Sequence, residues 1–462
     1  MVSEQQSEAA GKGVPAGFKL TEVGVIPEDW EVKTIGQLNP FITSGSRGWA
    51  DFYVDYGDLF VRITNMSRNS IYLDTKISEN KFVSLPATST EGKRTQLNNG
   101  DVLISITADI GIIGYVDESI AKPAYINQHI SLVRFDNNSI DNKFVAYFLA
   151  SENVQKKFLA NSDVGAKAGM NLNGVRSIIF ALPTIKEQSA IAEVLTDIDA
   201  LIVELKKALI KKQAIKTATM QQLLTGKTRL PQFSLRKDGT IKGYKKSELG
   251  DFPEDWKIST LGDFISRLDA GVSVNSVNGK DIFSHGKKIL KTSCVSNGNF
   301  YSHEAKSIVS DDINRAKITP KKGCIIISRM NTPNLVGELG YVERDEPNLY
   351  LPDRLWQMNV CQEQIIDNRW LAYILSLPLI SNKLKETATG TSNSMKNISK
   401  DSLYSLSFPK PPKEEQTAIA SILSDMDEEI QALQQHLDKT RQLKQGMMQE
   451  LLTGKTRIIK RN

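Results

Sequence analysis

The sequence has few of the residues that build metal centres or disulfide frameworks. Its 462 residues include three cysteines and four histidines, and no two cysteines stand at a CxxC spacing. Because a structural zinc site needs clustered ligands, we expect no metal site, and we expect the thiols to be buried and reduced. No apolar run reaches the roughly 18 residues of a membrane helix, and the first residues lack a signal-peptide profile. These absences favour a cytoplasmic protein that does not contact a membrane.

A strong excess of charge of one sign is also missing. The net charge is +5 and the isoelectric point is near 8.8, which permits nucleic-acid binding without requiring it. Hydrophobic residues make up 40% and charged residues 24%, as in ordinary globular proteins, and the length suffices for two or three domains. Residues 1–17 are small and polar and predict a disordered tail.

An internal repeat is the strongest signal in the chain. The segment Thr21–Trp30 returns as Ser247–Trp256, and Ile140–Tyr147 returns as Ile366–Tyr373, each 226 positions later. Both pairs keep the order of their key residues, including the Pro-Glu-Asp-Trp that ends the first pair. The chain therefore contains two copies of one unit, each a globular head followed by a helical segment.

The helical segments resemble each other more than the heads do. Pro183–Arg229 returns without a gap as Pro411–Arg457, with 23 of 47 positions identical, and both copies end in Leu-Leu-Thr-Gly-Lys-Thr-Arg. A protein that reads two different short targets from one framework would show this contrast. Heads that have drifted apart without a purpose would show it too.

Each helical segment carries apolar residues at alternating steps of four and three, which is a heptad seam. Thr184 and Glu187 fit a capping box at the first start, and Gly226 and Gly454 stand where left-handed residues end helices. We expect two helices of about 40 residues that pack antiparallel as a coiled coil. The predicted seam is Ile191, Leu195, Ile198, Ile202, Leu205, Leu209, Ile419, Leu423, Met426, Ile430, Leu433 and Leu437.

The layout resembles the specificity subunits of type I restriction–modification systems. The family's helix opening, Pro-Pro-x-x-Glu-Gln-x-x-Ile-Ala, is matched from Pro183 and again from Pro411, although the first copy has Pro-Thr. The Gly-x-x-Pro-x-x-Trp head openings and the Leu-Leu-Thr-Gly-Lys-Thr-Arg endings also match, and the resemblance runs from about Phe18 to the C-terminus.

The resemblance implies two α+β target-recognition domains in a pseudo-twofold arrangement, joined by two long antiparallel helices that set the distance between two half-sites. It also implies docking of two methyltransferase subunits, which use S-adenosylmethionine, and of nuclease/translocase subunits, which use ATP and magnesium. The expected segments are a tail at 1–17, recognition domain 1 at 18–181, helix 1 at 182–230, recognition domain 2 at 231–409 and helix 2 at 410–462.

Within the heads, residues 102–106, 130–135 and 324–328 predict strands, and residues 144–159 and 370–384 predict helices, the second interrupted by Pro378. Base reading needs Arg, Lys, Asn, Ser or Thr side chains on loops or strand ends. We favour Arg47, Arg62, Asn65, Lys93, Arg94, Thr107 and Lys167 in the first head, and Lys291, Ser293, Arg329, Asn331 and Arg354 in the second. Trp30 and Trp256 are interpreted as core anchors rather than stacking platforms.

The sequence contains no complete catalytic motif of a DNA methyltransferase or of a nucleotide-binding phosphate loop. Asn39-Pro40-Phe41 lacks the second proline of an adenine-methyltransferase motif, and Gly226-Lys227 lacks the glycine that a phosphate loop needs five positions earlier. We therefore expect no catalytic residue and no cofactor in this chain. Two alternatives stay open: an enzyme that acts on DNA by itself, and a coiled-coil scaffold that binds only proteins.

Overall fold

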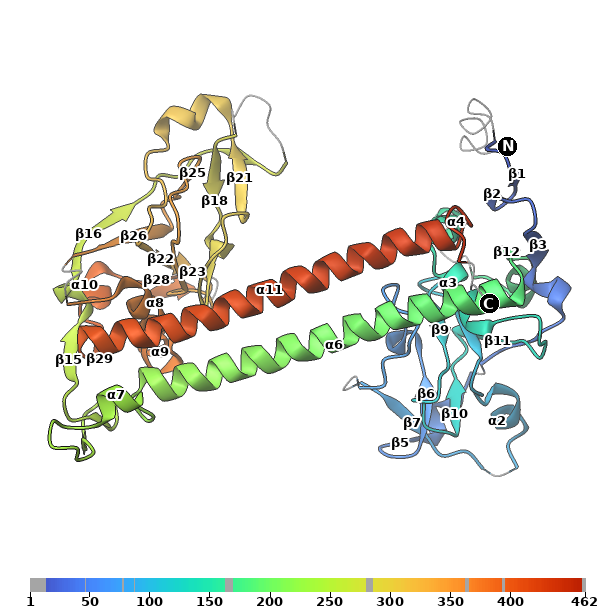
Figure 1. Cartoon of the computed structure of the whole chain (residues 1–462), viewed down its shortest axis with the longest axis horizontal. Helices are drawn as coiled ribbons and strands as arrows, with labels where there is room; N and C mark the ends of the chain where they lie inside the picture. Colours follow the sequence, from blue (N-terminus) through green and yellow to red (C-terminus); the bar gives the residue numbers. More distant parts are fainter. Residues whose placement is uncertain are drawn as a thin grey trace. The chain divides into compact units, whose positions relative to one another are not determined.

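The computed structural model describes residues 14–45, 47–76, 79–86, 88–162, 169–279, 286–361, 365–392 and 395–458. The chain divides into two compact units (Figure 1). Unit 1 holds the described residues up to Lys207 together with those from Gln434 onward, and unit 2 holds Ala208–Leu433. Each unit thus combines one head, the beginning of the helix that follows this head, and the end of the other long helix.

The head of unit 1 consists mainly of two four-stranded sheets, with strand orders β4-β11-β8-β9 and β10-β6-β7-β5. Its strands are β1 (Phe18–Thr21), β2 (Gly24–Pro27), β3 (Glu31–Thr34), β4 (Phe41–Ser44), β5 (Tyr53–Val54), β6 (Asp58–Val61), β7 (Lys81–Val83), β8 (Val102–Ser105), β9 (Ile113–Tyr115), β10 (Ala124–Ile126), β11 (Ile130–Arg134) and β12 (Ile179–Leu182). Its helices are η1 (Ile35–Leu38), η2 (Trp49–Phe52), η3 (Ile63–Asn65), α2 (Thr90–Thr95), α3 (Asn142–Leu149), α4 (Glu152–Ser162) and α5 (Leu172–Arg176).

The sheet β4-β11-β8-β9 is the middle layer of this head. Successive strand residues point to opposite faces, so Val102 and Ile104 pack with α3 and the start of the following long helix, while Leu103 packs against the second sheet. A sheet that is buried on both faces holds its ends rigidly, and the loops at those ends are positioned by it.

The head of unit 2 follows the same plan around a six-stranded sheet, β16-β26-β22-β24-β20-β19. Its strands are β13 (Tyr244–Lys245), β14 (Phe252–Pro253), β15 (Lys257–Thr260), β16 (Ile265–Ala270), β17 (Ser276–Val277), β18 (Lys288–Leu290), β19 (Val295–Ser296), β20 (Gly298–Phe300), β21 (Ala305–Ile308), β22 (Ile325–Ser328), β23 (Met330–Asn331), β24 (Leu339–Tyr341), β25 (Leu349–Tyr350), β26 (Leu355–Val360), β27 (Thr389–Ser392), β28 (Met395–Asn397) and β29 (Ser407–Lys410). Its helices are α7 (Pro231–Ser234), η4 (Leu261–Asp263), η6 (Thr292–Cys294), η7 (Ser310–Arg315), α8 (Asn368–Ser376), α9 (Pro378–Glu386) and α10 (Lys400–Tyr404).

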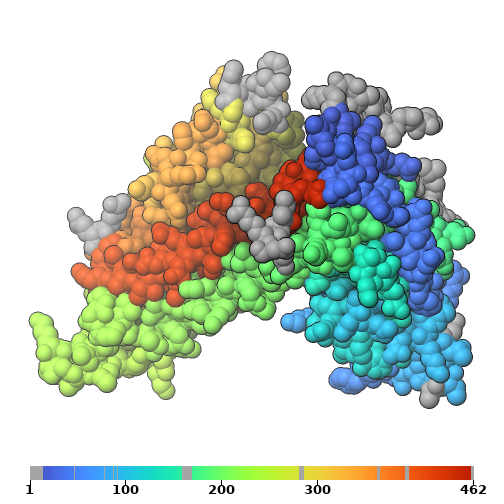
Figure 2. Space-filling view, turned by 45° about the vertical axis from the view of Figure 1, so that its right-hand side comes forward, coloured from blue at the N-terminus to red at the C-terminus, as the bar shows by residue number. Residues whose placement is uncertain are grey.

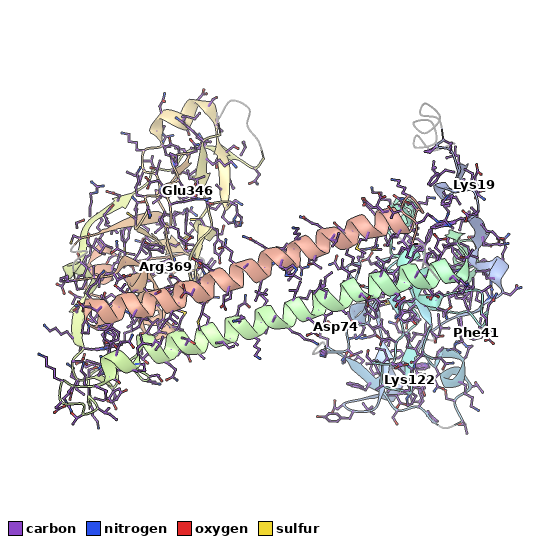
Figure 3. All side chains as sticks on the ribbon, viewed as in Figure 1. Lys19, Phe41, Asp74, Lys122, Glu346 and Arg369 are labelled. Atoms are coloured by element: carbon purple, nitrogen blue, oxygen red, sulfur yellow. The ribbon has the colours of Figure 1, made fainter. Side chains whose placement is uncertain are left out.

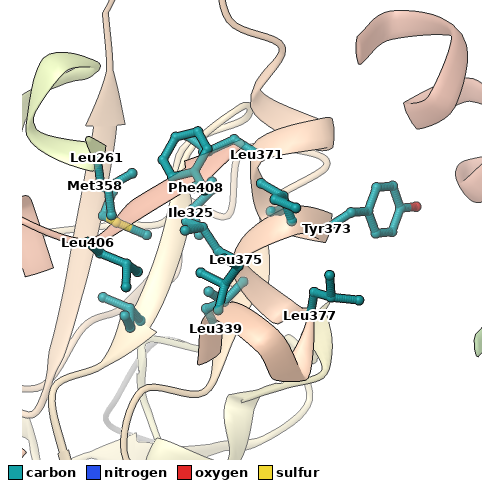
Figure 4. Packing of buried hydrophobic residues seen from close by; sticks show 14 of the residues in the cluster. Leu261, Ile325, Leu339, Met358, Leu371, Tyr373, Leu375, Leu377, Leu406 and Phe408 are labelled. Carbon is teal, nitrogen blue, oxygen red and sulfur yellow. The ribbon is translucent and has the colours of Figure 1, made fainter. Parts of the chain in front are cut away.

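The two faces of β22 separate the core of unit 2 in the same way. Ile325 and Ile327 pack with Leu339, Phe408 and the residues of α8 (Figure 4). Ile326 faces the opposite side and packs with residues of β18 and β25. Both heads are therefore α+β domains with a sheet between a helical layer and a second sheet.

The long helices are α6 (Ile185–Leu224, 40 residues) and α11 (Lys413–Leu451, 39 residues), in agreement with the expected length. They run antiparallel inside each unit. In unit 2, Lys212 and Lys216 of α6 pair with Glu429 and Asp427 of α11, and the two helices lie side by side (Figures 1 and 2). No helix among the described residues is both long and apolar enough to span a bilayer.

The predicted seam residues all turn to the buried side, but they do not simply face one another. Because Asp199 pairs with Lys444, the stretch of α6 that contains Ile202 and Leu205 lies opposite a stretch of α11 that offers Thr440 and Lys444. Antiparallel pairing sets the apolar first half of one helix against the more polar second half of the other. Eight seam residues are buried (Ile191, Leu195, Ile198, Ile202, Leu205, Ile419, Leu423 and Leu437), and Leu209, Met426, Ile430 and Leu433 are half-buried.

The strand predictions at 102–106, 130–135 and 324–328 are confirmed by β8, β11 and β22. Pro378 does separate α8 from α9, as predicted, but the first head also has a break, between α3 and α4, where Ser151 precedes α4. The predicted capping box is half wrong: the Glu187 N–H donates to Thr184 Oγ1 at 3.4 Å, whereas its carboxylate binds other partners.

Candidate nucleic-acid interface

One edge of the middle sheet of unit 1 gathers the ends of several strands. The last residues of β4 and β8 lie opposite the first residues of β11, because both strands pair antiparallel with it. The segment Asn127–His129 links β10 to β11 at this edge, and the Asn127 N–H donates to the last carbonyl of β6 at 3.1 Å. We call residues 45, 47, 62–65, 106–107 and 127–129 reading edge 1.

Polar side chains of the link Asn127–His129 occupy the centre of reading edge 1. Gln128 and His129 are half-buried, and the amide nitrogen of Gln128 lies 3.0 Å from His129 Nε2. Thr107, a predicted base-reading residue, makes a hydrogen bond to His129 Nδ1. Sequence reasoning missed Gln128 and His129, although a polar pair directly before the predicted strand at 130–135 was visible.

Arg47, Lys93 and Arg94 lie around the end of β4. Arg47 and Lys93 are exposed, with no ion pair among the residues that the structure describes. The guanidinium of Arg94 reaches from α2 and donates to Thr43 and, at 2.8 Å, to the carbonyl of Ser44. Arg47 and Lys93 are therefore available to a phosphate, whereas Arg94 also holds α2 against β4.

Arg62 and Asn65 follow β6, where the sequence placed them, but both are used inside the head. The side chain of Asn65 is 1% exposed, and its amide donates to the carbonyl of Asp74 and to Asn80 Oδ1 at 2.9 and 2.7 Å. It cannot reach a base edge in this conformation, because the turn after β6 consumes its hydrogen bonds. Arg62 donates to the carbonyl of Glu79. Lys167 lies outside the described residues.

The head of unit 2 has an equivalent edge. Ser328, at the end of β22, lies opposite Leu355, at the start of β26, and the link Pro352–Arg354 enters β26 from β25. The Arg329 N–H donates to the carbonyl of Arg354 at 3.0 Å, as the Ile106 N–H does to His129 in unit 1 at 2.9 Å. We call residues 291–293, 329–331 and 352–354 reading edge 2.

Reading edge 2 carries three cationic side chains, Lys291, Arg329 and Arg354, beside the carboxylate of Asp353. Arg354 is exposed, and the guanidinium of Arg329 lies 5.2 Å from the centre of the Trp356 ring. Lys291 Nζ and Ser293 Oγ lie 3.4 and 2.7 Å from one carboxylate oxygen of Glu304, and the hydrogen bonds from Ser293 and Lys291 hold the pKa of this carboxyl below its usual value. Lys291 and Ser293 are therefore already paired within the head.

Asn331 is held at the start of the three-stranded sheet of unit 2. Its amide donates to Ser328 Oγ at 3.2 Å, and its carbonyl oxygen accepts from the Thr332 N–H at 2.9 Å. Of the five residues favoured in this head, Arg354 is the one most open to a ligand.

A polar cluster, which we call clamp 1, fastens the end of α11 to the head of unit 1. It consists of Asp29, Trp30, Glu187 and Arg457. The guanidinium of Arg457 makes two bonds of 2.9 Å to Asp29 and also binds Glu187, whose carboxylate accepts from Trp30 Nε1 at 3.2 Å. The hydrogen bonds from Arg457 hold the pKa of Asp29 below its usual value.

Clamp 2 repeats this cluster in unit 2 with Asp255, Trp256, Glu415 and Arg229. Arg229 binds Asp255 at 2.8 and 3.1 Å and Glu415 at 2.9 and 2.5 Å, and Trp256 Nε1 donates to Glu415 at 3.1 Å. Burial alone would raise the pKa of Asp255, but the hydrogen bonds from Lys242 and Arg229 lower it overall. Trp30 and Trp256 are 1% and 0% exposed, which confirms that they are core anchors.

Two glycines make the clamps possible. Gly226 and Gly454 have φ of +69° and +68°, which ends α6 and α11 and turns the following arginine toward the head, as the sequence predicted. A Cβ on Gly226 would lie 2.5 Å from Pro253, and one on Gly454 would lie 2.4 Å from Pro27. Only glycine fits either position.

A glutamine near the start of each long helix is hydrogen-bonded to the residue that caps a helix of the head, α3 in unit 1 and α8 in unit 2. Gln188 Oε1 accepts from the N–H of Asp141, which caps α3, at 2.9 Å, and its amide donates to the carbonyl of Pro183 at 2.8 Å. Gln416 makes the same bonds to Asp367 and Pro411, both at 2.8 Å. Both glutamines are buried, so their amides are satisfied inside the protein.

The described residues hold no group of three or more histidine, cysteine, aspartate or glutamate side chains that could bind a metal ion. All three cysteines are free; Cys294 and Cys324 are buried and Cys361 is half-buried. Burial raises the pKa of the Cys294 and Cys324 thiols, which keeps them protonated.

Comparison with known proteins agrees with this arrangement. The chain is 26% identical over 454 residues to a Methanocaldococcus jannaschii protein provisionally described as the MjaX specificity subunit of a type I restriction enzyme, covering 96% of this chain and 97% of that one. It is 25% identical to the MjaVIII specificity subunit of the same organism, covering 94% of each chain. The crystal structure of the type I restriction–modification S subunit from M. genitalium shares the fold, with a TM-score of 0.57, 14% identity and coverage of 94% of this chain and 97% of that one.

The family model of the type I restriction–modification DNA specificity domain matches twice, at residues 27–214 and 253–441. Each match begins at a head opening and ends within a long helix, so it covers a reading edge and three of the four clamp residues in each copy. With two matched domains, two equivalent reading edges and a duplicated clamp, this chain belongs to the specificity subunits of type I restriction–modification systems.

Proposed function

We propose that this chain gives sequence specificity to a type I restriction–modification complex by binding a bipartite, asymmetric site in double-stranded DNA, one half-site per head. The observation that carries the proposal is that two edges with the same strand arrangement bear different side chains. Gln128 and His129 stand where Asp353 and Arg354 stand in the other copy, and Ile106 and Thr107 stand where Arg329 and Met330 stand. Such side chains on strand ends and loops can read base edges in a groove.

In this proposal α6 and α11 set the spacing between the half-sites. Each clamp ties a head to both long helices of its unit, so a head cannot turn freely on its support. The heads then act as fixed readers, and a site with the wrong number of intervening base pairs binds less tightly.

The chemistry of the complex belongs, in this proposal, to partner subunits. The chain has no catalytic role; it docks two methyltransferase subunits, which use S-adenosylmethionine, and nuclease/translocase subunits, which use ATP and magnesium. The complex works in the cytoplasm, where the chromosomal DNA is.

Genome-wide mapping of methylated adenine in a host with and without the gene tests the proposal. We expect one bipartite motif, with two unlike halves and a fixed gap, to be methylated only when the gene is present. Purified chain should shift duplexes that contain this motif, with an affinity that falls steeply with salt, and should transfer no methyl group alone. Methylation by the isolated chain would favour an enzyme acting by itself. Failure to shift any duplex with all partner subunits present would favour a protein-only scaffold.

A further inference from the structure

Inside each unit, a tyrosine, an aspartate and a lysine meet where the head helix, α6 and α11 come together. In unit 1, Tyr147 of α3 donates to Asp199 Oδ2 of α6 at 2.8 Å, and Lys444 of α11 donates to Asp199 Oδ1 at 2.6 Å. The ammonium of Lys444 also lies 5.6 Å from the centre of the Tyr147 ring. We call these three residues junction 1.

Unit 2 repeats the arrangement as junction 2, with the roles of the long helices exchanged. Tyr373 of α8 donates to Asp427 Oδ2 of α11 at 2.6 Å, Lys216 of α6 binds Asp427 Oδ1, and its ammonium lies 5.4 Å from the ring of Tyr373. Figure 4 shows the phenol of Tyr373 extending away from the other labelled side chains of the core, with its hydroxyl outermost. The tyrosine, aspartate and lysine therefore make the same connection twice, and in unit 2 Arg369 (Figure 3) adds a second cation, 3.4 Å from Asp427 Oδ2.

The junctions are largely withdrawn from water. The side chains of Asp199 and Lys444 are 10% and 11% exposed, and those of Asp427 and Lys216 are 18% and 12% exposed. Burial raises the pKa of Tyr147 and Tyr373, so both hydroxyls stay protonated and donate to the carboxylates. Buried ion pairs are weak sources of stability because desolvation offsets their attraction, but they can favour one register over others.

The apolar contacts around junction 1 discriminate poorly between registers. Ile191, Ile198 and Leu205 repeat at seven-residue intervals along α6, so a shift by one heptad replaces one apolar contact by another. Thr440, the other buried polar residue of this stretch of α11, donates to its own helix at the His436 carbonyl and contributes no bond across the pair. A shift would, however, leave Asp199 and Lys444 buried without each other.

We propose that junctions 1 and 2 fix the register of α6 against α11 and the seat of each head on this pair, and thereby restrict recognition to one spacing between half-sites. The statement about spacing rests on the proposed function, whereas the statement about register does not. The three residues of each junction act by positioning the heads and do not touch DNA.

The register is tested in the full-length chain with two spin labels. Lys206→Cys and Gln435→Cys place labels at exposed positions of α6 and α11 in unit 1, in a Cys361→Ser background. The parent should give one narrow distance distribution. The variant that makes both junctions apolar (Tyr147→Phe, Asp199→Leu, Lys444→Met, Tyr373→Phe, Asp427→Leu and Lys216→Met) should stay folded by thermal melting. It should give a broader distribution, or a second maximum at another distance, because a shift by one heptad slides one label ~10 Å along the helix axis. A distribution as narrow as that of the parent overturns the proposal.

Glu204→Gln is the matched control, because it breaks the exposed pair of Glu204 and Lys207 within α6 alone and should leave the distances unchanged. If the apolar variant does not fold, the register is tested by exchanging the charges of Asp199 and Lys444. Lys444→Asp alone sets two carboxylates together and should broaden the distribution, and Lys444→Asp with Asp199→Lys should narrow it again. A double variant no narrower than the single one contradicts the proposal.

The consequence for DNA is measured with duplexes that carry both mapped half-sites at the natural gap and at one base pair more or less. With methyltransferase subunits present, the apolar variant should lose about tenfold of its preference for the natural gap and keep its base preferences within each half-site. Broadened distances with an unchanged gap preference would refute the role of the helices in spacing. If no split site binds at all, the proposed function fails, and the distance measurement still decides the register.

Discussion

The clamps of the two units are built from the same residue types, whereas the reading edges of the two units carry different side chains. Clamp 1 and clamp 2 contain the same four residue types with the same partners, and each ties a buried tryptophan to a carboxylate and an arginine. The reading edges share their strand arrangement, yet Gln128 and His129 stand where Asp353 and Arg354 stand in the other copy. Identity between the copies thus marks what supports the heads, and difference marks what we propose the heads to read.

The largest effect is expected at the clamps, and it should differ between units. The side chain of Arg229 is 5% exposed, whereas that of Arg457 is 35% exposed. Arg229→Ala leaves Glu415 buried without its cation and should destabilise unit 2 by ~3–5 kcal/mol, and Arg457→Ala should cost unit 1 only ~1–2 kcal/mol because water replaces part of the interaction. Urea unfolding of the full chain measures both. Equal losses from the two variants would contradict the different burial of the two arginines.

Single substitutions at the reading edges should each affect one half-site. Arg354→Ala should relax discrimination at one position of the half-site read by the second head by ~1–3 kcal/mol, and Gln128→Ala should do the same in the other half-site. Binding to duplexes with each position varied in turn measures the effect. Asn65→Ala is the contrasting variant, because its buried side chain should change stability and leave base preference as it was. An effect of Arg354→Ala on both half-sites would break the division between the heads.

A smaller and uniform effect is expected at exposed cations that contact phosphates. Lys93→Ala and Arg47→Ala should weaken binding to all duplexes alike, and each should lower the slope of log affinity against log salt by ~1. Titrations at several salt concentrations give the slope. Altered base preference with an unchanged slope would place these residues on bases instead.

The smallest expected effect is the loss of folding stability at acidic pH. The folded-state pKa values of Asp29 and Asp255 lie below the ordinary value of 3.8, so their contribution to stability is present above that pH and is lost as the pH falls through the folded value. We expect stability to fall below about pH 4, and Asp255→Asn should remove part of that dependence. Unfolding curves between pH 2 and pH 6 test this; a parallel dependence in the variant would exclude the contribution of Asp255.

The two long helices and their ends could be predicted from the sequence because the internal repeat contains the same pattern twice. The heptad steps predicted α6 and α11, and Gly226 and Gly454 predicted their ends. The clamps and junctions were missed, since their members, such as Asp29 and Arg457, lie hundreds of residues apart and meet only after folding. Their identity in both copies was the available signal.

The reading edges were predicted less well. Arg47, Lys93 and Arg354 are exposed, but Asn65 is buried, and Lys291 and Ser293 already bind Glu304. Residue type and position after a strand suggest a contact, whereas burial and pairing depend on neighbours that only the fold supplies. Gln128 and His129 come to the edge through the link between β10 and β11, and the local sign of them was a polar pair directly before the predicted strand at 130–135.

Exchange of the first head tests the central claim most directly. Residues 18–181 are replaced by the corresponding head of another specificity subunit, with both long helices kept, and methylated adenine is mapped in a host that supplies the partner subunits. The account predicts that one half of the methylated motif changes while the other half and the gap between them stay the same. A motif that changes in both halves, or a gap that changes with the head, would contradict it.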